Sequence, residues 1–220
     1  MNLSDLNREV LSCRKCSRLV EWREKVAREK RRAYKDWDYW GKPVPGFGDP
    51  EARVFVVGLA PGAHGSNRTG RQFTGDASGN FLYPALYRAG FASQPDSTRR
   101  DDGLVLKDLY TAPVCRCAPP QNKPTMTEML NCQPYLEQEF ALIKPIVIVA
   151  LGRIAFDSVL RIYSIRNSGW RFAHAATFPL PDRKMLLCSY HPSQQNTLTG
   201  RLTITMFDRV WQSARSLSEK

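Results

Sequence analysis

The sequence predicts an α/β protein: a three-layer α/β/α sandwich around a central, mainly parallel four-stranded sheet. Three observations predict this fold. Short apolar runs rich in β-branched residues recur along the chain, each bounded by Gly or Pro. Helix-like segments separate these runs, and such alternation is typical of a parallel sheet covered on both faces. The 220 residues, 42% of them hydrophobic, suit a single globular domain.

The expected elements follow in order along the chain. Strands are predicted at 53–60, 108–115, 145–152 and 184–192, and helices at 79–90, 125–143, 152–163 and 203–217. The second of these helices opens with a plausible cap, Thr125 or Thr127 ahead of Glu128. Pro134 lies inside it and should break or kink it, because proline cannot donate the helical hydrogen bond.

Residues 23–50, just before the first predicted strand, start as a basic helical stretch and end in an aromatic, proline-rich loop. A solvated helix face is the simpler interpretation of its charges. We expect the aromatic residues to pack this N-terminal segment onto the sheet; they are Trp37, Tyr39, Trp40 and Phe47.

Charge, hydrophobic pattern and cysteine content indicate which partner and which cellular compartment to expect. The 32 Lys and Arg exceed the 21 Asp and Glu, giving a net charge of +11, which favours a polyanionic partner, although a merely basic protein is the alternative. No signal-like start or apolar run of about 18 residues is present, so we expect a cytoplasmic protein without membrane contact. In that reducing setting, cysteines are ligands or buried thiols more often than disulfides.

Polar segments follow each predicted strand. They read "GLAPGAHGSNRTGRQFTGDASGN", "RCAPPQNK", "GRIAF" and "HPSQQNTLTG". Because ligands bind outside the carboxyl ends of parallel strands, these segments should share one rim. The sequence therefore predicts a site for a phosphate-bearing or heterocyclic substrate.

Two cysteines, Cys13 and Cys16, have the two-residue spacing of metal ligands in "CRKC". A second pair must come from Cys115, Cys117, Cys132 and Cys188. Four thiolates bind either zinc or an iron-sulfur cluster, and the wide scatter along the chain favours a cluster that fastens the N-terminal segment. Cys188 reads as a buried, inert thiol, whereas spacing does not choose between Cys115 and Cys117.

Several motifs, taken together, resemble the iron-sulfur uracil-DNA glycosylases of the uracil-DNA glycosylase superfamily. They are "GLAPGAHG", "GRQFTGDASG", "RCAPPQNKPT", "NCQPYL", "VALG" and "YHPS", in that order over about residues 10–195. The resemblance is closest to the family 5, or type b, branch, because Leu59 stands where family 4 has Glu. It implies a DNA repair enzyme that flips out uracil, and other deaminated bases such as hypoxanthine, and excises them by hydrolysis.

The resemblance also implies a structural 4Fe-4S cluster. Its four ligands would be Cys13, Cys16, Cys117 and Cys132, since Cys117 precedes "APP" and Cys132 precedes "QPY". Cys115 is then a spare thiol. We expect one domain over residues 1–220, with segment 1–48 fastened by the cluster.

Excision requires stabilisation of a cationic sugar and of a departing anionic base. The resemblance implies a catalytic role for Asp76, although a helix cap near Ser78 is a competing role. His191 would donate to the uracil O2. Relatives place an Asn where this chain has Pro113, so either Asn122 or the backbone is expected to read the uracil edge.

Further residues are predicted to contact the substrate. Phe73 would stack on the flipped base, and His64 would contact phosphate or sugar. Leu198 is a candidate wedge and Arg201 a candidate phosphate contact. Binding is also assigned to Gly58, Ala60, Gly62 and Ser193.

We expect a monomer that acts on duplex DNA, and also consider single-stranded DNA; DNA binding would associate it with the nucleoid. The main alternative is a non-catalytic iron-sulfur or zinc protein that binds nucleic acid. A hydrolase using Cys188 or Ser189 with His191 is disfavoured, because strand alternation sends Cys188 and His191 to opposite faces. An N-glycosidase acting on free nucleosides is a third alternative.

Overall fold

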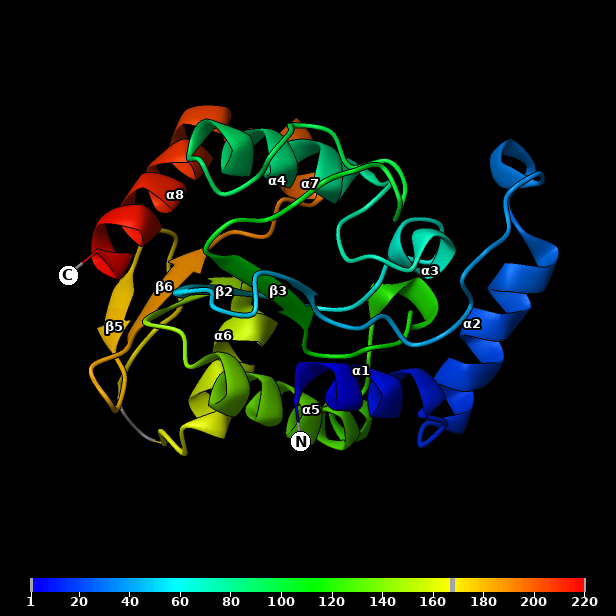
Figure 1. The fold of residues 1–220 in the computed structure, drawn as a ribbon, viewed down its shortest axis with the longest axis horizontal. Helices are drawn as coiled ribbons and strands as arrows, with labels where there is room; N and C mark the ends of the chain where they lie inside the picture. Colours follow the sequence, from blue (N-terminus) through cyan, green and yellow to red (C-terminus); the bar gives the residue numbers. More distant parts are fainter. Residues whose placement is uncertain (1, 167–168, 220) are drawn as a thin grey trace.

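One sheet forms the centre of the protein, in a computed structural model that describes residues 2–166 and 169–219 (Figure 1). Within that part of the chain, six strands pair in the order β1-β3-β2-β4-β6-β5. The inner four, β3, β2, β4 and β6, are parallel, and the edge strands are antiparallel. The strands are β1 (Phe47–Gly48), β2 (Val54–Gly58), β3 (Leu109–Pro113), β4 (Val147–Leu151), β5 (Thr177–Pro179) and β6 (Met185–Ser189).

The prediction of a mainly parallel sheet is confirmed, but the number of four strands is wrong. The missed strands lie at the two edges, and they are only two and three residues long. Such short pieces are only half-buried or exposed, so they show no apolar run.

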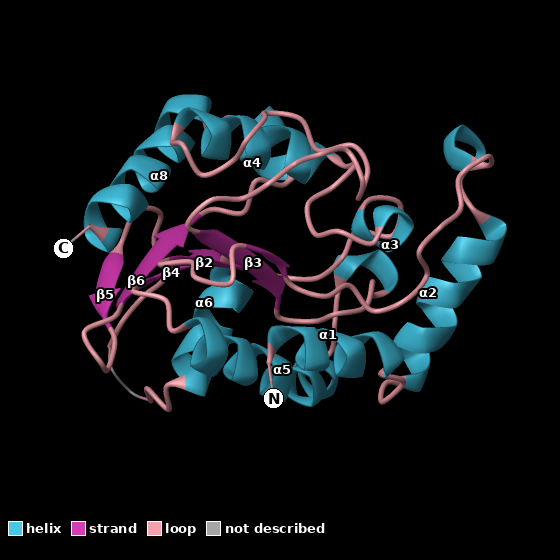
Figure 2. Cartoon of the chain, in the orientation of Figure 1, coloured by secondary structure: helices cyan, strands magenta, loops and turns pink. Residues whose placement is uncertain are grey.

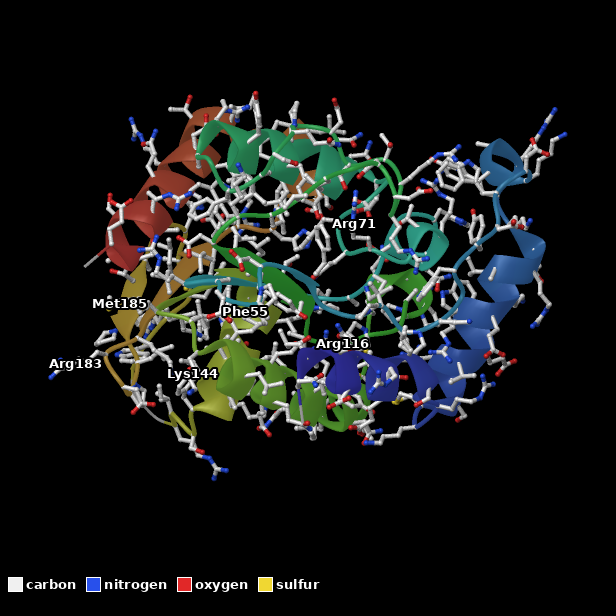
Figure 3. All side chains as sticks on the ribbon, viewed as in Figure 1. Phe55, Arg71, Arg116, Lys144, Arg183 and Met185 are labelled. Carbon is white, nitrogen blue, oxygen red and sulfur yellow. The ribbon has the colours of Figure 1, made fainter. Side chains whose placement is uncertain are left out.

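Helices cover both faces of the sheet, as predicted (Figure 2). On one face lie α4 (Ala77–Arg88) and α8 (Ile204–Ser218), and on the other lie α5 (Met126–Ile143) and α6 (Arg153–Ile162). Successive side chains of β2 point to opposite faces of the sheet. Val54 and Val56 pack toward α4 and α8, whereas Phe55 packs toward α5. Figure 3 shows Phe55 on the α5 side and Arg71 on the opposite side.

Helix α5 begins as the sequence predicts. Thr125 is its N-cap, and a capping box forms with Glu128. Of the break or kink predicted at Pro134, the break does not occur, because α5 continues to Ile143. Proline removes one backbone hydrogen bond from the helix. The burial of Tyr135 and Leu136, which follow it, stabilises the helix despite this loss.

The N-terminal segment wraps one end of the molecule with α1 (Leu3–Ser12), α2 (Ser17–Glu29) and η1 (Arg32–Tyr34) (Figure 1). Leu6 and Val10 of α1 pack against Tyr135 of α5. Arg18 of α2 donates two hydrogen bonds of 2.8 Å to the Glu128 carboxylate. These contacts fix the segment against α5.

The aromatic residues of this segment do not all pack on the sheet. Phe47 does, as part of β1. Trp37 instead lies 4.0 Å from the Arg68 guanidinium carbon, and Trp40 packs on Gly70, so both cover the loop around α3 (Ser66–Thr69). The expectation is therefore wrong for the tryptophans. None of the described helices combines the length and apolar character that a membrane span requires.

Candidate active site

A cavity of about 760 Å³ opens at the carboxyl edge of the parallel strands, the place that the fold predicts. We call it the base cavity. Segments after β2, β3 and β6 contribute to its walls. Eight predicted site residues line it: Ala60, Gly62, His64, Phe73, Asp76, Asn122, His191 and Ser193. Three predicted contacts among the described residues lie outside this lining: Gly58, which is buried at the end of β2, Leu198 and Arg201.

Phe73 is held in an unusual conformation on the cavity wall. Its φ is 53°, in the left-handed region that bulky residues rarely adopt, and its side chain is 5% exposed. The Phe73 ring centroid lies 6.0 Å from that of His191, with the planes tilted by 43°. Such a backbone costs about 1–3 kcal/mol and is typical of functional sites.

Asp76 is a helix cap that also lines the base cavity, and its catalytic role stays a prediction. It is the N-cap of α4, where Oδ1 accepts the Gly79 N–H at 2.9 Å. Its other oxygen, Oδ2, faces Gly65 so closely that a Cβ there would overlap it. Burial raises the pKa of the Asp76 carboxyl, opposed by backbone donors and by the Arg68 charge. The cap thus orients one oxygen, and the second lies beside the "GLAPGAHG" loop.

His191 follows β6 on a loop that neighbouring side chains hold in place. The His191 carbonyl accepts a 2.9 Å hydrogen bond from Asn196 Nδ2. His174 Nδ1 accepts the N–H of Tyr190 at 3.3 Å, and the His174 ring stacks on the Tyr190 ring. Burial lowers the pKa of His191 to about 4. The imidazole is therefore neutral at pH 7 and carries one N–H donor.

His64 lies on the wall that the N-terminal segment completes. Its Nδ1 is 3.1 Å from the Tyr39 hydroxyl, and its carbonyl accepts a 2.7 Å bond from Arg68 Nε. Burial lowers the pKa of His64. A neutral, oriented imidazole at this wall suits the predicted contact with sugar or phosphate.

Four predicted site residues, Asn122, Ser193, Leu198 and Arg201, lie on short helices or in the loops beside them. Asn122 is exposed in η2 (Pro120–Asn122) with a φ of 57°, which asparagine tolerates. Ser193 caps α7 (Gln194–Leu198), and Leu198, at its end, is 78% exposed. Arg201 lies over the Tyr190 ring, 4.6 Å from its centroid. The assigned roles of these residues stay predictions.

Sequence reasoning missed several lining residues, namely Arg31, Tyr34, Gln72, Gln194 and Gln195. Arg31 and Tyr34 come from the N-terminal segment, and no local pattern indicates that this segment reaches the cavity. Gln72 adjoins Phe73, so its place in the "GRQFTG" motif was the available signal.

The four predicted ligand cysteines line a second, much smaller cavity, which we call the cysteine cavity. Cys13 ends α1 and Cys16 caps α2, whereas Cys117 follows β3 and Cys132 lies in α5. Arg116 and Lys15 also line this cavity.

Two side chains donate to the sulfurs of the cysteine cavity. Arg23 Nη1 is 3.0 Å from Cys117 Sγ, and Asn131 Nδ2 is 3.4 Å from Cys16 Sγ. Burial raises the pKa of Cys117 to about 12, and the Arg23 charge opposes this shift. Across the described residues, no three His, Cys, Asp or Glu side chains form a group that would hold a single metal ion.

The two cysteines left over are buried. Cys115 is 0% exposed and packs with Cys117 and Cys132. Cys188 is 0% exposed within β6, and burial raises the pKa of its thiol to about 12, which suits an inert thiol. Among described residues Cys188 is absent from the base cavity, so a Cys188–His191 hydrolase has no shared site.

Fold and site together define an α/β protein whose cavity offers an aromatic ring, a carboxylate and a neutral imidazole to a heterocyclic ligand. The family model of the uracil DNA glycosylase superfamily matches residues 45–215. The chain therefore belongs to the uracil-DNA glycosylase superfamily.

Individual relatives agree with this assignment. A Type-5 uracil-DNA glycosylase of Thermus thermophilus is 54% identical over 208 residues, covering 94% of each chain. One of Mycobacterium leprae is 49% identical, covering 99% of this chain and 96% of the relative. A Type-4 uracil-DNA glycosylase of Archaeoglobus fulgidus is 32% identical over 74% of this chain and 66% of the relative.

Proposed function

We propose that this protein is a monofunctional DNA glycosylase of base excision repair, which hydrolyses the bond between uracil and deoxyribose to leave an abasic site. One observation carries the proposal: Asp76, Phe73 and His191 line a single cavity in a member of this superfamily. Relatives that share about half of its residues are Type-5 uracil-DNA glycosylases.

Each of these side chains has a role in the reaction. The C1′–N1 bond breaks, water adds to C1′, and the base leaves as an anion that takes up a proton. Asp76 Oδ2 orients the water or stabilises the cationic sugar. His191, being neutral, donates its N–H to the uracil O2 as negative charge develops, a contribution of about 3–4 kcal/mol to the barrier. Phe73 stacks on the base.

The range of bases is expected to extend beyond uracil. A cavity of about 760 Å³ has room for a bicyclic purine such as hypoxanthine as well as for a pyrimidine. A recessed site requires the nucleotide to leave the base stack, which costs roughly a few kcal/mol, and we expect the exposed Leu198 to fill the gap.

We further propose that Cys13, Cys16, Cys117 and Cys132 hold a 4Fe-4S cluster, which supplies structural support rather than chemistry on the base. The donor set supports this: four cysteines line one cavity, Arg23 donates to Cys117 Sγ, and Lys15 adds a second positive charge beside them. Four thiolates are a ligand set that a 4Fe-4S cluster takes. Such a cluster would fasten segment 1–48 within a single domain.

The substrate is duplex DNA, with single-stranded DNA as a second candidate form, bound by a monomer at the nucleoid. The net charge of +11 supports a nucleic-acid partner, because each phosphate contact releases counterions. Affinity should therefore fall steeply as salt rises.

The test is excision from end-labelled duplexes that carry a single U·G, U·A or hypoxanthine·T pair, followed by alkali. Strand breakage only after alkali would establish a monofunctional glycosylase and rank its substrates. Binding to these duplexes without breakage would overturn the proposal and leave a non-catalytic nucleic-acid-binding protein. Release of base from free deoxyuridine at an equal rate would support a nucleosidase instead.

A further inference from the structure

A glutamine that precedes Phe73 lies on the floor of the base cavity. Gln72 is 2% exposed and belongs to the loop between α3 and α4. Its side chain contacts Thr111, in the middle of β3, and approaches Gly58, the last residue of the neighbouring parallel strand β2. Gln72 is thus placed where the fold directs a ligand.

Hydrogen bonds fix Gln72 while leaving its amide nitrogen free. The Thr111 hydroxyl donates to Gln72 Oε1 at 2.9 Å, and the Tyr83 hydroxyl donates to the Gln72 carbonyl at 2.9 Å. Among the described residues, Gln72 Nε2 is buried without an acceptor. A buried donor without a partner is destabilising, so this unpaired amide points to an acceptor that arrives with a ligand.

Gly58 brings this amide beside the Phe73 ring. A Cβ on Gly58 would overlap Gln72 Nε2 and would lie 2.8 Å from Phe73 Cζ. The amide nitrogen and the tip of the ring therefore lie next to the same glycine. A base stacked on Phe73 would present its edge to the Gln72 amide.

We propose that Gln72 is a specificity-determining residue whose Nε2 donates to the exocyclic carbonyl that deamination places on a base: O4 of uracil or O6 of hypoxanthine. This inference rests on the proposed function. Cytosine and adenine carry an amino group at that position, which would oppose one donor with another and leave both unpaired. With His191 on O2, the two oxygens of uracil each meet a donor.

This assignment explains how the base can be read although Pro113, which stands where relatives have Asn, has no side-chain amide. Gln72 supplies an amide from the loop between α3 and α4. The Thr111 hydroxyl donates to Gln72 Oε1 and so orients the amide nitrogen. Gly58, which lies outside the cavity lining, then acts by leaving room for the amide.

The test is a double-mutant cycle in which one change removes the Gln72 amide from the protein and the other removes the O4 carbonyl from the base. Wild-type protein and Gln72→Met are compared on duplexes with uracil or pyrimidin-2-one, which lacks O4, opposite guanine. Two quantities are measured: single-turnover excision, and anisotropy-detected binding of the 2′-fluoro analogues, which resist cleavage. The ratio between two enzymes cancels the intrinsic difference in leaving-group ability.

We expect wild type to favour uracil over pyrimidin-2-one by about 10- to 100-fold more than Gln72→Met does. Equal ratios in the two proteins would overturn the role of Gln72, even if both excise uracil. If excision fails but the binding ratios differ, the proposed function is lost while the inference about Gln72 stands.

Stability supplies a second readout that a purely structural glutamine would not give. Gln72→Met removes a buried unpaired donor but also removes the acceptor of the buried Thr111 hydroxyl, so the free variant should unfold at about the same temperature as wild type. Gly58→Ala, which displaces the amide, should lower the preference for uracil in the same way as Gln72→Met. A Gln72→Met protein that is destabilised and keeps full preference for uracil would contradict the inference.

Discussion

The cysteine cavity and the base cavity differ in what holds them together. In the cysteine cavity the four candidate ligands are of one kind, and they come from the end of α1, the start of α2, the chain after β3, and α5. The base cavity gathers different kinds of side chain, and several of them also do structural work, as Asp76 does in capping α4. Four cysteines can be recognised as candidate ligands from the sequence alone. A site built from different side chains can be recognised only once the backbone brings them together.

The largest expected effect concerns the cysteine cavity and compares two cysteines that are two residues apart. Cys117→Ser should lose most of its iron, about four atoms per chain in the wild type, because a proposed ligand is removed. Cys115→Ser is the matched control and should keep its iron. Iron analysis and visible absorption of protein purified without oxygen are the measurements. Equal iron in the two variants would place the cluster elsewhere.

Asp76 tests whether capping and catalysis can be separated in the base cavity. Asp76→Asn keeps an oxygen that can accept the Gly79 N–H, so its melting temperature should be unchanged. Loss of the charge should slow single-turnover excision by about 100- to 1,000-fold. Asp76→Ala should lose activity and, in addition, about 0.5–2 kcal/mol of stability. Full activity in Asp76→Asn would reduce Asp76 to a helix cap.

His191 should make stability depend on pH. Its pKa is about 4 in the folded protein, against about 6.5 when unfolded. Between these values the unfolded state binds the extra proton, so the free energy of unfolding falls as pH falls from about 6.5 to 4, by about 3 kcal/mol.

The difference between wild type and His191→Asn, followed by urea unfolding over that pH range, isolates this contribution. The variant should lose less stability on acidification. Parallel curves for the two proteins would show that His191 is not held neutral by burial.

His174 tests how firmly the loop before His191 must be held. His174→Phe keeps a ring to stack on Tyr190 but removes the acceptor of its N–H, so excision should fall about 10-fold. His174→Asn supplies an acceptor at a similar place and should restore most of the activity. Steady-state kinetics should show the loss mainly in kcat. If His174→Phe and His174→Asn are equally slow, the hydrogen bond is not what positions the loop.

Much of the fold could be predicted because the four inner strands are apolar runs and the helices between them carry caps such as Thr125. The edge strands β1 and β5 could not, since two or three half-exposed residues carry no periodicity. In the base cavity, motifs indicated Phe73, Asp76 and His191. They did not indicate Arg31 and Tyr34, because their place depends on how the N-terminal segment folds back over the cavity.

The central claim, that the base cavity is the place of excision, is tested most directly by measuring free base. Wild-type protein and Asp76→Asn are incubated with a duplex carrying one U·G pair, and released uracil is quantified by mass spectrometry under single-turnover conditions. The account predicts one uracil per duplex from wild type and at least about 100-fold slower release from Asp76→Asn, with equal DNA binding. No uracil from a wild-type protein that binds the duplex, or equal release from both proteins, would contradict it.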